Sequence, residues 1–168
     1  MGEKFMKKNL LLLLLLSLPI FAEDYFSFIG LNTSYEQVEL DSAYNTEDTT
    51  HTTVSMRIGT QTRTWRASIA LENGNKYQSF EMNFDVIPFD EFFGTPKIRP
   101  YIGIGGTFLT YNNESIPESD GYGFGGNLGF ILYAGENVDV DIAYRYSIIN
   151  IEGVDNIQGV RLGIHYFY

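Results

Sequence analysis

Residues 138–147 read Val-Asp-Val-Asp-Ile-Ala-Tyr-Arg-Tyr-Ser, and this stretch decides the fold. Apolar residues occupy nearly every second position, and two aspartates and an arginine stand between them. Because successive side chains of a β-strand point to opposite faces, the stretch predicts a strand with one apolar and one polar face. Residues 159–168, Gly-Val-Arg-Leu-Gly-Ile-His-Tyr-Phe-Tyr, repeat the pattern at the end of the chain.

Six further segments alternate in the same way. They are residues 25–36, 52–61, 64–72, 78–87, 99–110 and 122–133. Eight strands of about ten residues each have the length that a tilted strand needs to cross a bilayer. An open sheet edge in hydrocarbon would leave backbone groups without hydrogen bonds, so the sheet must close. The predicted fold is all-β, an eight-stranded antiparallel transmembrane β-barrel.

A soluble β-sandwich also alternates, and it is the structural alternative. Three features favour the barrel: charges in the middle of the polar faces, tyrosines at the ends of the apolar faces, and connections that alternate in length. Long external loops are predicted at 37–51, 111–121 and 148–156, and short periplasmic turns at 61–63 and 134–137.

Two connections depart from that pattern. Residues 73–77 form a short external loop, and residues 88–98 form a long periplasmic turn that contains Pro88 and Pro96. The sequence suggests no function for the long turn.

The N-terminus has the pattern of a secretory signal peptide. Three lysines precede a leucine-rich stretch at residues 10–18, and Ala22 supplies a small residue at the expected cleavage point. A transmembrane anchor is the alternative, but it needs roughly 20 apolar residues. Translation could start at Met6 as well as at Met1, because both leave a basic segment before the leucines. The predicted organisation is a cleaved signal peptide at 1–22 and a barrel at 23–168.

Charge and composition narrow the classes of function. Without residues 1–22 the chain has 8 basic and 20 acidic residues, a formal net charge of −12. Nucleic-acid binding needs a basic face, so we expect no nucleic-acid partner. The chain has no cysteine, which excludes disulfides and thiolate metal sites. No cofactor or metal site is predicted.

The second half of the chain resembles small outer-membrane barrels of the OmpA and opacity-protein type. The likeness lies in Arg-Pro-Tyr-Ile-Gly-Ile-Gly-Gly-Thr-Phe (99–108), Gly-Phe-Gly-Gly-Asn-Leu-Gly-Phe (123–130) and the stretch at 138–146. It is a likeness of motifs over residues 97–168 and of periodicity alone before them. The resemblance implies an exported barrel domain in the bacterial outer membrane, in contact with lipid and lipopolysaccharide. The peptidoglycan-binding role of the larger family members is not carried over to this chain.

The last strand adds a second resemblance. Arg161, Gly163, Tyr166 and Tyr168 resemble the C-terminal signal that the barrel assembly machinery reads in such proteins. The usual last residue of that signal is phenylalanine, so Tyr168 departs from it. The resemblance implies that this machinery is a partner during biogenesis.

The polar faces predict a charged lumen. An eight-stranded barrel encloses a space that side chains fill, and buried charges must be paired. The predicted structural cluster is Arg57, Arg66, Glu72, Glu81, Asp85, Asp139, Asp141, Arg145, Arg161 and His165, together with Glu36. We expect Asp139 to contact His165, and Asp141 to lie near Arg161. The alternative role for these charges is an ion path.

A catalytic site is conceivable but not predicted. Nucleophilic catalysis needs a nucleophile next to a base, and the chain has only two histidines. His51 is expected in the first external loop, near Ser55, Glu47 and Asp48. The pair Gly103 and Gly105 lacks the third glycine of a dinucleotide site. Glycines on the lumen face are better explained as room for large neighbours and for bending of the wall.

The external loops are the most distinctive predicted surface. They carry acidic residues and almost no basic ones, Lys76 being the exception: Glu36, Glu39, Asp41, Glu47, Asp48, Glu114, Glu118, Asp120, Glu152 and Asp155. They suit a lipopolysaccharide layer bridged by divalent cations, or they recognise a cationic or host partner. The predicted function is a non-catalytic structural barrel with acidic loops that serve adhesion or interaction. The alternatives are a narrow ion channel and, less favoured, an enzyme that modifies lipid or peptide.

Overall fold

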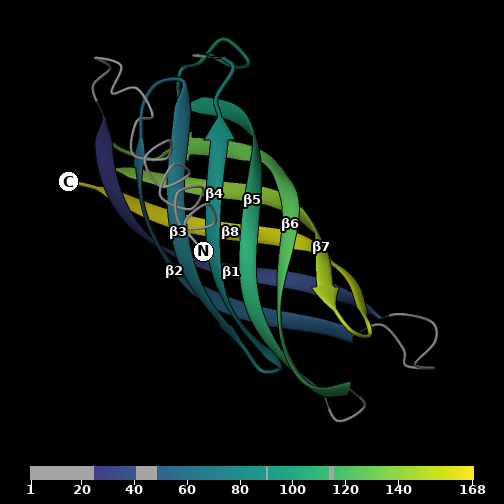
Figure 1. The fold of residues 1–168 in the computed structure, drawn as a ribbon. Coiled ribbons are helices and arrows are strands. Elements are labelled where there is room, and N and C mark those ends of the chain that lie inside the picture. The colour runs from purple at the N-terminus through teal and green to yellow at the C-terminus, as the bar shows by residue number, and fades with distance from the viewer. Residues whose placement is uncertain (1–24, 41–48, 90, 114–115) are drawn as a thin grey trace, which may run out of the picture.

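The computed structural model describes residues 25–40, 49–89, 91–113 and 116–168. They form a closed antiparallel barrel in which each strand pairs with its neighbours in sequence and the last pairs with the first (Figure 1). The strands are β1 Phe26–Leu40, β2 Thr49–Gln61, β3 Trp65–Gly74, β4 Tyr77–Val86, β5 Ile98–Asn113, β6 Ile116–Tyr133, β7 Val138–Ile151 and β8 Val154–Phe167. The predicted eight-stranded barrel is confirmed. The predicted signal peptide at 1–22 lies outside the described residues.

The described residues hold no helix that is both long and apolar enough to span a membrane.

The two ends of the barrel differ in what they carry. We call the end with Tyr25, Tyr168 and the turns 62–64, 87–97 and 134–137 the terminal end. The opposite end joins β1 to β2, β3 to β4, β5 to β6 and β7 to β8, and we call it the loop end. In Figure 1 the 87–97 turn lies at the top and the tips of β5 and β6 lie at the bottom.

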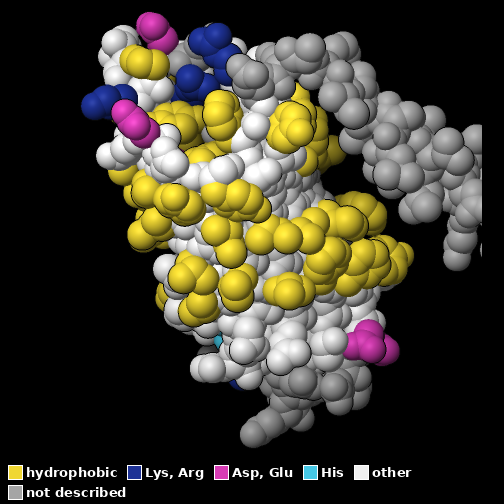
Figure 2. Space-filling view, turned by 90° about the vertical axis from the view of Figure 1, so that its left-hand side faces the viewer, with side chains coloured by type: hydrophobic (Ala, Val, Ile, Leu, Met, Phe, Trp, Pro, Cys, Tyr) yellow, Lys and Arg dark blue, Asp and Glu magenta, His cyan; other side chains and the backbone are white. Residues whose placement is uncertain are grey.

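The outer surface of the barrel is apolar over most of its height. Leu31 and Ile104 point outward and are 61% and 71% exposed, whereas Arg66 and Asp85 point inward and are 0% exposed. Hydrophobic side chains form a broad band across the face seen in Figure 2. We call this band the belt. A water-soluble protein has the opposite arrangement, so the belt is suited to hydrocarbon and the interior to polar groups.

The predicted long loops at 37–51, 111–121 and 148–156 are wrong, because the strands run further than the sequence indicated. β1 continues to Leu40, β2 begins at Thr49, β7 continues to Ile151 and β8 begins at Val154. Beyond the belt the apolar residues change sides. On β1, Val38 and Leu40 are buried, while the intervening positions are exposed. A strand in which the apolar residues move from one face to the other loses its alternation in the sequence, so it has the appearance of a loop.

These inward apolar side chains form a hydrophobic core inside the loop end of the barrel. We call it the loop-end core. It contains Val38, Leu40, Tyr77, Leu109, Tyr111, Ile149, Ile151, Val154 and Ile157, all at most 7% exposed. The strands above the belt therefore fold as they would in water, with apolar groups inside and polar groups outside.

Candidate functional site: the filled lumen

The structure brings the predicted polar side chains together inside the barrel. Each of them is at most 8% exposed. They come from five strands: Arg57 on β2, Arg66 and Glu72 on β3, Glu81 and Asp85 on β4, Asp139, Asp141 and Arg145 on β7, and Arg161 and His165 on β8. Glu36 on β1 joins them and is 1% exposed. It is a lumen residue and not part of an external loop.

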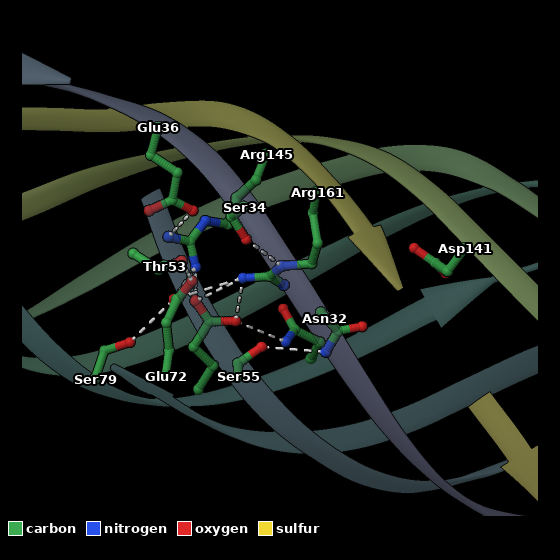
Figure 3. Close-up of polar contacts among 12 residues, drawn as sticks. Asn32, Ser34, Glu36, Thr53, Ser55, Glu72, Ser79, Asp141, Arg145 and Arg161 are labelled. Carbon is green, nitrogen blue, oxygen red and sulfur yellow. Dashed lines mark hydrogen bonds and ion pairs between the residues drawn. The ribbon is translucent and has the colours of Figure 1, made fainter. Parts of the chain in front are cut away.

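Arg145 is the centre of the ion pairs nearest the loop end (Figure 3). Its Nη2 lies 2.6 Å from Glu36 Oε1, and its Nη1 lies 3.3 Å from Glu72 Oε2 and also pairs with Glu81. These three glutamates come from β1, β3 and β4, so Arg145 spans the lumen from β7. The Tyr77 hydroxyl donates a further hydrogen bond to Glu36.

Arg161 binds the same acidic group from β8. Its Nη2 lies 2.9 Å from Glu81 Oε2 and 3.7 Å from Glu72 Oε2, and its Nε donates to Ser34 Oγ at 3.2 Å. The Thr53 and Ser79 hydroxyls also donate to Glu72. Hydrogen bonds therefore supplement the ion pairs, which is what buried charges require.

A second ionic group lies nearer the terminal end and centres on Arg66. Its Nε donates to Asp85 Oδ2 at 2.8 Å, and its Nη1 lies 2.7 Å from Asp141 Oδ2. The guanidinium carbon stands 4.5 Å from the centre of the Tyr101 ring, a cation–π distance. The Tyr101 hydroxyl donates to Asp141 at 2.9 Å, which closes the group.

One of the two predicted lumen contacts is confirmed and the other is wrong. Asp139 pairs with His165 in the β7–β8 register, and Oδ1 lies 2.8 Å from His165 Nδ1. Asp141, in contrast, pairs with Arg66, while Arg161 pairs with Glu72 and Glu81. Hairpin register predicts neighbours on adjacent strands, whereas long arginine side chains reach across the lumen.

Arg57 differs from the other arginines of the lumen. It is 1% exposed, and its Nε and Nη1 have no hydrogen-bond partner, as is also true of Nη1 and Nη2 of Arg66. Among the described residues no ion pair joins it to a carboxylate, whereas Arg66, Arg145 and Arg161 each have at least two carboxylates as partners. Nothing in the alternation pattern distinguishes Arg57 from the other three arginines.

Among the described residues, side chains occupy the lumen from the loop end to the terminal end. The loop-end core lies above the ionic groups, and a second apolar cluster of Ile87, Tyr101, Ile131 and Ala143 packs with Tyr133 toward the terminal end. A cavity lined by Glu81, Asn127 and Arg145 measures about 10 Å³, close to the smallest space that holds one water molecule.

Glycine makes this filling possible. A Cβ atom at Gly103 would stand 2.1 Å from Asp85 Oδ1 and 2.3 Å from Asn127 Oδ1. One at Gly30 would stand 2.1 Å from the His165 ring. The steric explanation for the lumen glycines is confirmed at these positions.

His51 lies on β2 and not in a loop, which corrects the prediction. It points inward, is 8% exposed and has Tyr77 and Tyr111 rings within 6.5 Å and 6.4 Å. Its Nε2 bonds to Thr49 Oγ1 at 3.1 Å, while Ser55 bonds to Asn32. The position is above the belt, where burial and then the charge of Lys76 lower the pKa of His51. Glu47 and Asp48 lie outside the described residues.

The residues of the predicted assembly signal divide between the two faces of β8. Arg161 points into the lumen, and a Cβ at Gly163 would stand 2.1 Å from Asn32 Oδ1. Tyr166 and Tyr168 are 52% and 76% exposed on the outside. The two inward residues therefore have packing roles of their own.

The described part of the predicted acidic surface lies at the loop end, without the buried Glu36. The exposed acidic side chains described there are Glu39, Asp120, Glu152 and Asp155. Asp41, Glu47, Asp48 and Glu114 lie outside the described residues, and the side chain of Glu118 is not described. Among the described residues no cluster of three or more His, Asp or Glu side chains has the arrangement of a metal site.

Comparison with known proteins identifies the architecture. No family model and no curated protein matches the chain. Among solved structures, Neisserial surface protein A has a TM-score of 0.65 at 14% identity, over 87% of this chain and all of that one. Ail of Yersinia pestis, in complex with the heparin analogue sucrose octasulfate, has a TM-score of 0.54 at 10% identity, over 86% of this chain and 99% of that one.

The N-terminal barrel domain of Pseudomonas aeruginosa OprF gives the same result. It has a TM-score of 0.52 at 15% identity and covers 83% of this chain and 97% of the domain. These likenesses concern the fold, and they agree with the resemblance found in the sequence. The chain has the fold of the small eight-stranded outer-membrane β-barrels of the OmpA and opacity-protein type.

Proposed function

We propose that the protein is an integral barrel of the bacterial outer membrane that conducts no ions and catalyses no reaction. It stabilises the membrane and presents an acidic rim, which consists of the exposed Glu39, Asp120, Glu152 and Asp155 at the loop end. The apolar belt supports insertion in a bilayer. Charged side chains fill the inside at the height of the belt, where a lipid-facing charge would be costly. Export through the predicted signal peptide at 1–22 belongs to the same proposal.

The filled lumen is the observation that carries the proposal. An ion that entered from the loop end would meet nine buried side chains of the loop-end core. It would then have to displace Arg145 and Arg161 from their carboxylates. Breaking such buried pairs is costly, because it leaves charges without partners. No specific observation favours the ion-channel alternative.

Planar-bilayer recording tests the closed lumen directly. The purified protein is inserted into a planar bilayer, and a conducting porin in the same lipid serves as the positive control for the assay. We expect no steady current above that of the lipid alone. Reproducible single-channel steps from the wild-type protein, at a frequency that rises with the amount added, would overturn the proposal.

The acidic rim suggests which extracellular partners to expect. The described rim has four exposed acidic side chains, and Lys76 is half-buried. Its charge suits a lipopolysaccharide layer through divalent cations, or a cationic ligand. The Ail structure holds a sulfated heparin analogue, and an acidic rim repels such a polyanion. Retention of the protein on immobilised heparin at physiological salt would contradict this part of the proposal.

We also propose that Tyr166 and Tyr168, with Arg161 and Gly163, form the signal read by the assembly machinery. Both tyrosines are exposed on the outside of β8. Their replacement therefore tests recognition by the assembly machinery without disturbing the packing inside the barrel. We expect a Tyr166→Ala/Tyr168→Ala variant to fold unaided in detergent like the wild type but to accumulate less in the outer membrane of cells. Equal accumulation would argue against the signal.

A further inference from the structure

The long turn at 87–97, which the structure describes except at residue 90, contains a small hairpin at Phe92–Thr95. The Phe92 and Thr95 backbones exchange two hydrogen bonds of 3.1 Å. At its base, the Ile87 N–H donates to the Thr64 carbonyl at 2.7 Å and the Tyr133 N–H donates to the Lys97 carbonyl at 2.8 Å. The turn is therefore fixed to the terminal end of the barrel wall at both of its ends.

The tip of this hairpin carries an aromatic side chain at an unfavourable position. Its backbone conformation is one that phenylalanine rarely adopts, and its ring is exposed. The two residues between Phe92 and Thr95 are Phe93 with φ 53° and Gly94 with φ 71°. Positive φ at both central positions is a type I′ turn, for which asparagine or glycine is the usual first residue. Phe93 is nevertheless 83% exposed, and Phe89 in the same turn is 57% exposed.

The hairpin is continuous with the lipid-facing belt. The Phe92 ring centre lies 5.7 Å from that of Phe130, which points outward from β6, and 4.3 Å from that of Phe93. A row of three aromatic rings thus runs from the barrel wall to the tip of the turn. The Phe92 ring therefore packs on the outer face of the barrel wall.

We propose that residues 91–96, together with Phe89, form an interfacial foot that inserts Phe93 and Phe89 among the phospholipids of the leaflet at the terminal end. The inference rests on the proposed insertion of the barrel in a bilayer. Aromatic side chains are favoured at the boundary between headgroups and acyl chains. Lys97 and Arg63 are exposed beside the turn, and Glu91 lies within it. Since these three charges sum to only +1, the aromatic rings carry the attachment and zwitterionic lipid suffices.

Depth-dependent fluorescence quenching tests this foot. Trp65 is the only tryptophan, so Trp65→Phe gives a background for single reporters. Phe93→Trp places a reporter at the tip, and Glu136→Trp places one in the exposed turn 134–137 at the same end of the barrel. Leu31→Trp reports on the belt. Each variant is inserted into phosphatidylcholine vesicles with bromine near the headgroups or deep in the acyl chains, and heat-modifiable migration on gels verifies folding.

The foot predicts a different result for each reporter. We expect Phe93→Trp to emit at shorter wavelength than Glu136→Trp and to be quenched several times more strongly, most by shallow bromine. Adding anionic phosphatidylglycerol should change this little. Adding Phe92→Ala, which removes the contact with Phe130, should reduce the quenching. Phe89→Trp serves as a second reporter in the turn if Phe93→Trp folds poorly.

Two outcomes would overturn the inference, and they can be told apart. If Leu31→Trp is quenched but Phe93→Trp and Phe89→Trp behave like Glu136→Trp, the foot is wrong and the inserted barrel stands. That result would leave the exposed rings as a contact for another protein. If Leu31→Trp is not quenched either, the proposed insertion itself fails.

Discussion

The belt and the loop end of this barrel follow opposite rules, although the same strands build both. In the belt, Leu31 on β1 points outward and is 61% exposed, while charged residues fill the inside. At the loop end, Val38 on the same strand points inward and is 0% exposed. The backbone alternates identically in both. What changes is the solvent outside the wall, and the comparison teaches that the apolar side of a strand follows the surrounding medium.

The belt half of this comparison is tested most strongly by replacing paired and unpaired arginines. Arg66 and Arg57 are both fully buried on adjacent strands, but only Arg66 has carboxylate partners. Arg66→Met strands two carboxylates, and we expect a loss of about 3–5 kcal/mol in the free energy of unfolding. Arg57→Met should cost about 1 kcal/mol or less, since it removes an unpaired buried charge. Urea unfolding in lipid vesicles measures both, and equal losses would contradict the difference.

The loop-end half is tested by two neighbouring isoleucines on β7. Ile149 is 6% exposed in the loop-end core, and Ile148 is 63% exposed on the outside. Ile149→Ala leaves a cavity and should lower the free energy of unfolding by about 2–5 kcal/mol. Ile148→Ala should lower it by about 1 kcal/mol or less. A larger loss at Ile148 would mean that the apolar residues do not change sides here.

The ionic group near the terminal end offers a finer test. The Tyr101 hydroxyl donates to the Asp141 carboxylate, and the Tyr133 hydroxyl accepts from the neutral Gln61 amide at 2.6 Å. Tyr101→Phe should cost about 1.5–3 kcal/mol, because hydrogen bonds to charged groups contribute more. Tyr133→Phe should cost about 0.5–1.5 kcal/mol. The same unfolding measurement compares them, and the reverse order would contradict the assignment.

The smallest effect is expected on the outside of the loop end. Asp155 is exposed there on β8. Asp155→Asn keeps the size of the side chain and removes its charge, and we expect the free energy of unfolding to stay within about 0.5 kcal/mol of the wild type. A larger change in the urea midpoint would indicate that the rim contributes to stability.

The strands of the belt could be predicted from the sequence because every second side chain there faces lipid and is apolar. The eight strands, their order and the Asp139–His165 contact all follow from alternation and from hairpin register. The loop end was missed because the phase reverses, as in the run Ile148-Ile149-Asn150-Ile151, where an apolar residue occupies both faces in turn. The sequence therefore predicts loops at 37–51, 111–121 and 148–156, where the strands in fact continue.

The partners within the lumen could not be predicted for a different reason. Arg145 reaches from β7 to glutamates on β1, β3 and β4. Such contacts depend on which strands face each other across the closed barrel. The register between adjacent strands does not give this information. The hairpin at Phe92–Thr95 was also missed, since Phe93 adopts a backbone conformation that its residue type disfavours.

Spin labelling along β1 tests the change of surroundings most directly. The chain has no cysteine, so Leu31→Cys and Glu39→Cys each give one labelled site, and both positions face outward on the same strand. In lipid vesicles we predict that the label at 31 is relaxed more by oxygen than by a water-soluble nickel complex, and the label at 39 more by the nickel complex. Equal oxygen preference at both sites, or nickel preference at 31, would contradict the account.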